Sequence, residues 1–179
     1  MLFRSNCAGA RFDWDKLDWL NAQVLHGQPA STLREWLLPL WQAEGWASAG
    51  PEADPLWQED LCALLGPSLT RLTDGVEQAA PFFKRPIPDQ AAQDQLSSDG
   101  ASAALTALLD GLPADQAPLP DAKALLDAAA GTAGVKKGVL MKSARAALLG
   151  SLQGPDLLST LALLQRIGEA RPRLKQALS

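Results

Sequence analysis

Residues 134–168 read GVKKGVLMKSARAALLGSLQGPDLLSTLALLQRIG, and this stretch decides the fold class. Alanine and leucine dominate it and β-branched residues are scarce, a composition that favours helices over strands. Gly154 and Pro155 interrupt the apolar pattern, so we expect one helix near 140–150 and another near 155–166. Pro155 suits the first position of the second helix, because its missing N–H would have no partner there.

The same helical spacing of apolar residues continues outward toward both ends of the chain. Asp13 is a suitable N-cap for a first helix, and a second helix is expected from Ser31 to about Glu44, with a kink or break at Pro39. Other helices are expected near 101–111, near 121–130 and after Pro172.

About nine helices and no strand follow from this pattern. The apolar face of residues 56–88 breaks at Gly66–Pro67, and Pro81, Pro86 and Pro88 close that segment. Residues 89–101 are polar and are expected to form a loose connection or a frayed helix start. The sequence therefore predicts an all-α fold with two helical lobes that divide within residues 86–100.

Composition narrows the class of protein. The chain has 179 residues, 47% of them hydrophobic, which fits one ordinary domain or two small ones. No apolar run reaches the roughly 18 residues of a membrane span, and the first residues lack a signal-peptide pattern. Cys7 and Cys62 are far apart, which indicates a reducing compartment and no disulfide framework. A soluble, cytoplasmic, monomeric protein is expected.

Charge is divided unevenly along the chain. Residues 134–179 carry eight lysines and arginines against only Asp156 and Glu169, a local charge of +6, although the whole chain has a net charge of −4. Within this basic end, Lys136, Lys137, Lys142 and Arg145 lie within ten residues. They form either a solvated face or a face that contacts phosphates.

No set of residues with catalytic spacing is present in the sequence. His26 is the one histidine, and the chain has no GxxxxGK[ST] phosphate loop, no HExxH and no CxxC. The carboxylates of Asp13, Asp15 and Asp18 are expected to favour a helix N-terminus rather than to bind a metal. We therefore expect no catalytic residue, no metal site and no cofactor in this chain.

All six tryptophans lie within the first 60 residues: Trp14, Trp19, Trp36, Trp41, Trp46 and Trp57. At helical spacing they are expected to be mainly core residues. Two alternatives are a platform on which nucleic-acid bases stack and a surface for a protein partner. Few basic residues lie beside the tryptophans, which weighs against the stacking platform.

Three segments carry a resemblance to a known family. Residues 8–27 read AGARFDWDKLDWLNAQVLHG, residues 64–83 read LLGPSLTRLTDGVEQAAPFF, and the third segment is 134–168. Together they resemble the C-terminal, non-catalytic part of a bacterial glutamyl-tRNA synthetase, a class I enzyme. The third match is the most specific, because it spans over thirty residues with fixed glycines and one arginine.

The resemblance implies a division of the chain into three segments. Residues 1–60 resemble a stem-contact segment, 61–100 the first helical half of the anticodon-binding domain, and 101–179 its second half. The HIGH-type and KMSKR signatures of the family's ATP site are absent. This implies a fragment of an aminoacyl-tRNA ligase that does not activate glutamate alone, with ATP and Mg²⁺ belonging to the missing catalytic part.

The resemblance also implies that the chain recognises the anticodon stem and loop of tRNA. The positions that face the anticodon would be Arg145, Gly154, Pro155 and Leu157. Arg145 would read a base edge, Gly154 would admit the backbone close to a base, and Leu157 would offer an apolar surface. The phosphate partners would be Lys136, Lys137 and Lys142. The family's usual threonine is Leu149 here, so its hydroxyl contact is lost.

Anticodon discrimination is a further implication. Some family members require cytosine at the last anticodon position through an arginine in the first helical half, near Gly66 in this chain. No arginine occurs between Arg34 and Arg71. The chain would then resemble the non-discriminating type, whose parent enzyme charges both glutamate and glutamine tRNAs with glutamate. The alternative function is a helical protein-interaction module with a tryptophan-rich partner surface.

Overall fold

The computed structural model describes residues 13–119 and 121–179. Within these residues the chain is helical and contains no strand, which confirms the all-α prediction. The α helices are α1 (Trp14–His26), α2 (Ala30–Ala43), α3 (Pro55–Leu65), α4 (Asp74–Phe83), α5 (Gln90–Leu96), α6 (Ala101–Gly111), α7 (Ala122–Ala133), α8 (Lys137–Leu149), α9 (Leu157–Arg166) and α10 (Ala170–Ala177). Two short 3₁₀ helices, η1 (Pro51–Ala53) and η2 (Gly66–Ser68), flank α3.

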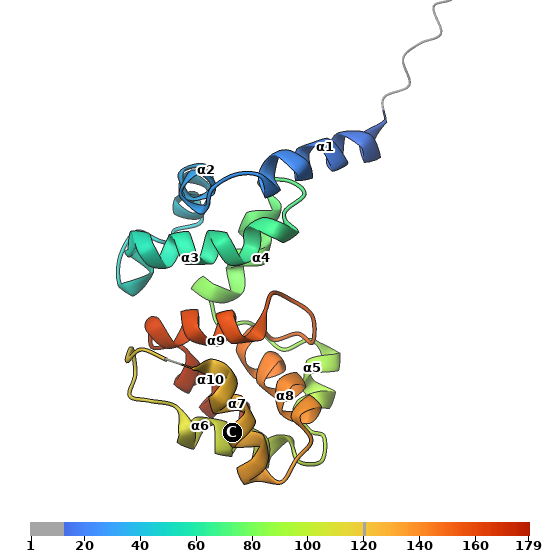
Figure 1. Ribbon diagram of the computed structural model, residues 1–179, viewed down its shortest axis with the longest axis vertical. Helices are drawn as coiled ribbons and strands as arrows, with labels where there is room; N and C mark the ends of the chain where they lie inside the picture. The colour runs from blue at the N-terminus through green and yellow to red at the C-terminus, as the bar shows by residue number, and fades with distance from the viewer. Residues whose placement is uncertain (1–12, 120) are drawn as a thin grey trace, which may run out of the picture.

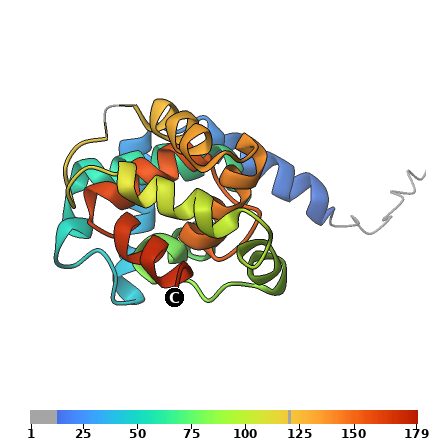
Figure 2. The ribbon, with the colours of Figure 1, turned by 90° about the horizontal axis from the view of Figure 1, so that it is seen from below.

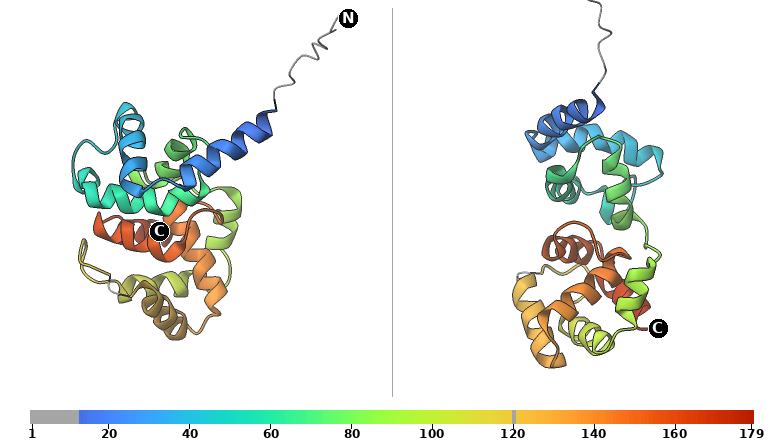
Figure 3. Two further views of the ribbon diagram at one scale, coloured as in Figure 1. Left: turned by 45° about the horizontal axis from the view of Figure 1, so that its top comes forward. Right: turned by 90° about the vertical axis from the view of Figure 1, so that its right-hand side faces the viewer.

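The helices gather into two lobes, as the sequence predicted (Figure 1). Helices α1–α4 form the first lobe and α5–α10 the second, and the chain passes between them once, after α4 (Figures 1 and 3). Seen from below, α1 extends away from the rest of the molecule (Figure 2). The finer division of the chain at residues 60 and 100 stays a prediction.

Aromatic side chains fill the core of the first lobe. The Phe83 ring lies 5.3 Å from the Trp41 ring, 5.2 Å from Trp46 and 5.5 Å from Trp57, centroid to centroid. Gly75 allows α4 to approach α2, because a Cβ atom at that position would lie 2.4 Å from Leu37 Cδ2. This close approach lets Trp41 Nε1 donate to the Gly75 carbonyl at 3.1 Å.

The six tryptophans therefore divide into two groups. Trp41, Trp46 and Trp57 are at most 8% exposed, which confirms the core interpretation for them. Trp14, Trp19 and Trp36, in α1 and α2, are between 38% and 65% exposed. Helical spacing alone did not separate these groups, because the packing of α1 against the lobe decides which side chains are covered.

One continuous core connects the lobes. Trp57 Nε1 of α3 donates to the Leu163 carbonyl of α9 at 3.0 Å. Arg85, just after α4, forms two hydrogen bonds with Glu169 of the second lobe, at 2.9 and 3.0 Å. The lobes are therefore held by buried packing and by polar bonds rather than by the linker alone.

Prolines and polar residues account for the differences from the predicted helices. Helix α2 continues through Pro39 without a break, because Leu37 and Trp41 are fully buried and hold that face against the core. Residues 90–96 form a regular helix, capped by Asp89, whose side chain accepts from Ala92 N at 2.7 Å. Helix α10 begins two residues before Pro172, at Ala170.

The prediction that Pro155 starts a helix is wrong. Helix α9 begins at Leu157, and Asp156 is its N-cap. The Asp156 carboxylate accepts from Ser159 N at 2.8 Å and from Ser159 Oγ at 2.9 Å, which satisfies the first turn better than a proline can. Pro155 therefore belongs to the connection between α8 and α9.

Candidate nucleic-acid interface

A cleft of about 380 Å³ lies between the two lobes, and we call it the interlobe cleft. The first lobe contributes residues of η2 and α4, and the second contributes the end of α8 and the connection to α9. Its lining consists of Ser68, Gln78, Pro81, Leu149, Ser151, Gln153, Gly154 and Pro155. Two residues that the sequence analysis assigned to anticodon contact, Gly154 and Pro155, thus line a single concave surface.

Glycine is required at position 154 by the path of the backbone. Gly154 has φ +136°, a conformation that side chains strongly disfavour. A Cβ atom there would lie 3.0 Å from Leu149 Cδ1 and 3.7 Å from Arg145 Nη1. The chain consequently turns tightly against Arg145 and leaves its backbone exposed at the cleft.

Arg145 braces this turn from α8. Its Nη1 donates to the Pro155 carbonyl at 2.6 Å, and the side chain is half-buried. A guanidinium has five N–H donors, and this is its one hydrogen bond among the described residues, so donors remain for a ligand. Asp156 does not pair with Arg145, because its carboxylate caps α9.

The role assigned to Leu157 does not fit the structure. Leu157 is 1% exposed and belongs to the core cluster, so its side chain offers no surface to a base. As the first residue of α9, it anchors the connection from inside. The sequence pattern missed this, because an apolar residue after a cap is equally compatible with core packing and with a ligand contact.

Two of the three lysines, Lys136 and Lys137, lie at the start of α8, and Lys142 lies near its middle. Lys136 is the N-cap position of α8, and Lys137 forms an ion pair with Asp127 of α7. Lys142 is exposed and precedes Arg145 by three positions, which makes the two side chains neighbours on the helix surface. Lys142 is therefore the lysine that α8 positions nearest to Arg145.

Part of the basic charge at the C-terminal end is used within the protein. Arg166 pairs with Asp60, Arg173 is buried, and Arg171 donates to the Leu112 carbonyl at 2.8 Å. The local charge of +6 therefore overstates the positive charge that this end presents to a partner.

Sequence reasoning did not identify the first-lobe wall of the cleft. Ser68 Oγ lies 2.6 Å from Gln78 Oε1 and 2.8 Å from the Leu65 carbonyl oxygen. The break at Gly66–Pro67 was visible in the sequence, but nothing local indicated that the chain after it faces residues 151–155. That contact depends on how the two lobes pack.

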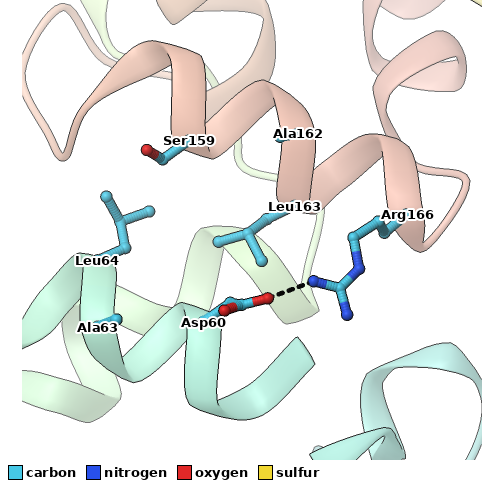
Figure 4. A pocket seen from close by; sticks show the side chains of 7 residues that line it. All are labelled: Asp60, Ala63, Leu64, Ser159, Ala162, Leu163 and Arg166. Carbon is cyan, nitrogen blue, oxygen red and sulfur yellow. Dashed lines mark hydrogen bonds and ion pairs between the residues drawn. The ribbon is translucent and has the colours of Figure 1, made fainter. Parts of the chain in front are cut away.

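A second concave surface, of about 440 Å³, lies between α3 and α9 (Figure 4). Asp60 and Arg166 form an ion pair with each other there, so their charges are mutually satisfied. Most of the other lining is aliphatic, with Ala63, Leu64, Ala162 and Leu163. This surface offers a ligand fewer unpaired polar groups than the interlobe cleft does.

Other chemistry has little support in the described part of the chain. His26 Nε2 lies 3.0 Å from the Leu69 carbonyl oxygen, a contact that ties α1 to the segment after η2. Residues 13–119 and 121–179 contain no group of histidine, cysteine and carboxylate side chains that could hold a metal ion. No helix in the same ranges has the length and apolarity of a membrane span.

Comparison with known families resolves the identity of the fold. A family model described as the anticodon binding domain matches residues 30–178. The chain belongs to the anticodon-binding domain family. The matched range includes both walls of the interlobe cleft, so the cleft is a feature of the domain itself.

Several curated proteins are similar to this anticodon-binding domain chain. The glutamate–tRNA ligase of Synechococcus sp. (strain CC9605) is 58% identical over 178 residues, which is 98% of this chain and 37% of that protein. The glutamate–tRNA ligase of Prochlorococcus marinus (strain MIT 9313) is 54% identical, with the same coverage. The chain thus spans little more than a third of the length of these relatives.

Solved structures share the fold. A glutamate tRNA ligase from Elizabethkingia meningosepticum CCUG26117, in complex with its amino acid, superposes with a TM-score of 0.78 at 24% identity. That match covers 96% of this chain and 33% of the ligase. The glutamate-tRNA synthetase of Elizabethkingia anophelis gives a TM-score of 0.69, also at 24% identity.

Proposed function

We propose that this chain binds the anticodon stem-loop of a glutamate tRNA, as the anticodon-recognition part of a glutamate–tRNA ligase. The observation that carries the proposal is that Gly154 and Pro155 line one cleft, with Arg145 hydrogen-bonded to the Pro155 carbonyl beside it, in a chain of the anticodon-binding domain family. Unpaired anticodon bases can be splayed into such a cleft and read at their edges. ATP, with Mg²⁺, would serve the catalytic part of the ligase.

Each residue has a separate role in this proposal. Arg145 keeps donors available after bracing the turn, so its guanidinium would contact a base edge. Gly154 would allow a base to approach the backbone. Lys142 would contact a phosphate, and Lys136 and Lys137 would contribute charge at the start of α8, Lys137 by exchanging Asp127 for phosphate.

We further propose that the domain accepts both glutamate and glutamine anticodons. The first-lobe wall of the cleft carries Ser68 and Gln78, which are uncharged. Arg71, the nearest arginine along the chain, forms two hydrogen bonds with Asp18 instead, at 2.8 and 2.6 Å. Among the described residues, the first-lobe wall of the cleft therefore has no arginine that could select cytosine.

A binding titration with anticodon stem-loops tests the main proposal. Arg145→Ala should weaken binding by about 1–3 kcal/mol and relax preference at one anticodon base. Lys142→Ala should weaken binding about equally for every anticodon and lower the salt slope by roughly one unit. Lys175→Ala, an exposed change in α10, is the control and should leave binding nearly unchanged.

Two outcomes would reject the assigned role of Arg145. One is unchanged base preference with equal loss for all stem-loops. The other is a lower melting temperature that accounts for the whole loss, since Arg145 also braces Pro155. Absence of salt-dependent binding by the unaltered chain would reject the proposed function itself.

One observation favours a second function for α1. Leu17, Leu20 and Val24 share one face of α1 by their spacing, and they are 43%, 45% and 55% exposed. An apolar helix face of this kind suits a protein partner, as the alternative hypothesis held. Val24→Ser should abolish such binding, which would be insensitive to salt, and should leave stem-loop binding intact.

A further inference from the structure

Helices α3 and α9 lie side by side across the boundary between the two lobes (Figure 4). Each leads to one wall of the interlobe cleft. Helix α3 continues into η2, which carries Ser68, and the Gly154–Pro155 turn comes just before α9. The placement of α9 against α3 therefore helps to set how the two walls face each other.

Every hydrogen bond that joins the described part of the first lobe to α9 reaches the last four residues of this helix. Trp57 Nε1 donates to the Leu163 carbonyl at 3.0 Å. Arg166 binds Asp60 and, at 3.3 Å, Asp54. The carbonyls in the last turn of a helix lack intrahelical donors, so Trp57 caps α9 from the opposite lobe.

The bond from Trp57 is the rigid one among these contacts. Trp57 is 1% exposed, and its ring meets the Phe83 ring edge to face at 5.5 Å, so the first-lobe core fixes the direction of its N–H. The side chains of Arg166, Asp54 and Asp60 are between 36% and 60% exposed, and exposed ion pairs are screened by solvent and salt. Trp57 is therefore the fixed point against which α9 is placed.

The opposite end of α9 leads to the cleft and has no such bond to the described residues of the first lobe. There α9 faces α3 across the concave surface of Figure 4, whose lining includes the small side chains Ala63 and Ala162. About 10 Å of helix separates Leu163 from the Gly154–Pro155 turn, so a rotation of about 6° at the Trp57 end would shift the turn by about 1 Å. Binding residues generally need placement within about 0.5 Å.

We propose that Trp57 is a positioning residue for anticodon binding. Through the Leu163 carbonyl it holds α9 so that the Gly154–Pro155 turn faces the first-lobe wall of the cleft. The inference rests on the proposed function and assigns Trp57 no contact with RNA. Loss of its N–H leaves the charges of the cleft in place but removes the fixed point of α9.

Trp57→Phe removes the N–H and keeps an aromatic ring, and Trp41→Phe is its matched control. Trp41 is also fully buried, packs against Phe83 and donates to a backbone carbonyl at 3.1 Å, but that carbonyl belongs to Gly75 of the same lobe. Both variants should lose similar stability, because each leaves one buried carbonyl without its donor. Only Trp57→Phe should disturb the cleft.

Stem-loop titration, well below the melting temperatures, is the first measurement. Trp57→Phe should bind about tenfold more weakly than the unaltered chain, and Trp41→Phe less than about twofold more weakly. The salt slope should stay the same in both, because neither change removes a charge. If Trp57→Phe does not fold, the benzothiophene analogue of tryptophan at position 57 keeps the shape of the ring without the N–H and replaces it.

The second measurement follows the lobes without RNA. Spin labels at Gln42→Cys in α2 and Ala124→Cys in α7 occupy exposed sites in different lobes, in a Cys7→Ser background where Cys62 is buried. Double electron–electron resonance should show a shifted or broadened interlobe distance in Trp57→Phe and an unchanged one in Trp41→Phe.

Two outcomes overturn the inference. One is an equal loss of stem-loop affinity in Trp57→Phe and Trp41→Phe, since a purely structural role predicts that result. The other is an interlobe distance that does not change in Trp57→Phe. Failure of the unaltered chain to bind any stem-loop overturns the proposed function instead, and the distance measurement still shows whether Trp57 places α9.

Discussion

Arg173 is a buried cation that caps two helices from different lobes. It is 2% exposed, and its Nη1 donates to the Pro81 carbonyl of α4 and to the Leu148 carbonyl of α8, the latter at 2.8 Å. Both carbonyls lie in the last turn of their helices, where no intrahelical donor is available. Burial lowers the pKa of Arg173, and the nearby Glu169 carboxylate opposes that shift.

Arg173→Met is expected to destabilise the fold by about 3–5 kcal/mol. It leaves the buried Leu148 carbonyl and the part-buried Pro81 carbonyl without this donor, at about 1–3 kcal/mol each, and the apolar side chain recovers part of that loss by packing. Glu169 is not left unpaired, because Arg85 still donates to it. For a chain of this size the change corresponds to a melting temperature lower by about 6–20 °C.

Urea and thermal unfolding followed by far-ultraviolet circular dichroism measure this loss. Lys175→Met makes the same charge change on the exposed face of α10 and should stay within about 0.5 kcal/mol of the unaltered chain. If Arg173→Met also stays within about 1 kcal/mol, the carbonyls of Pro81 and Leu148 do not depend on this donor, and the capping argument is refuted.

Two other predictions concern ionisable groups. Hydrogen bonds from Arg85 hold the pKa of Glu169 below its ordinary value of 4.5, so Glu169 stabilises the folded state above about pH 4.5 and this contribution is lost as pH falls. The unfolding free energy of Glu169→Gln should therefore vary less with pH, between about pH 5 and 3, than that of the unaltered chain. An unchanged slope of unfolding free energy against pH would contradict this assignment. Cys62 is buried, and burial raises the pKa of its thiol to about 12. In a Cys7→Ser variant, a thiol reagent at neutral pH should therefore label the chain only as fast as the chain unfolds. Rapid labelling would show that the Cys62 thiol is accessible in the folded state.

Local sequence determined the helices and many of their boundaries. Asp13 caps α1 as expected, with its carboxylate 3.1 Å from Lys16 N, and the spacing of apolar residues was sufficient to exclude strands. These features depend on contacts within a few residues, which a sequence displays directly. The break between two helices at Gly154 was likewise predicted from the sequence. Its φ of +136°, which favours glycine, explains why a glycine stands there.

Only the tertiary structure decided which of the candidate side chains line the interlobe cleft. Leu157 and Leu149 look alike in sequence, yet Leu157 is buried behind the turn while Leu149 also lines the cleft. Ser68 and Gln78 meet the Gly154–Pro155 turn because α4 and α8 belong to lobes that pack together, at separations of more than 70 residues along the chain. Such long-range contacts depend on how two cores fit, and no local pattern encodes that fit.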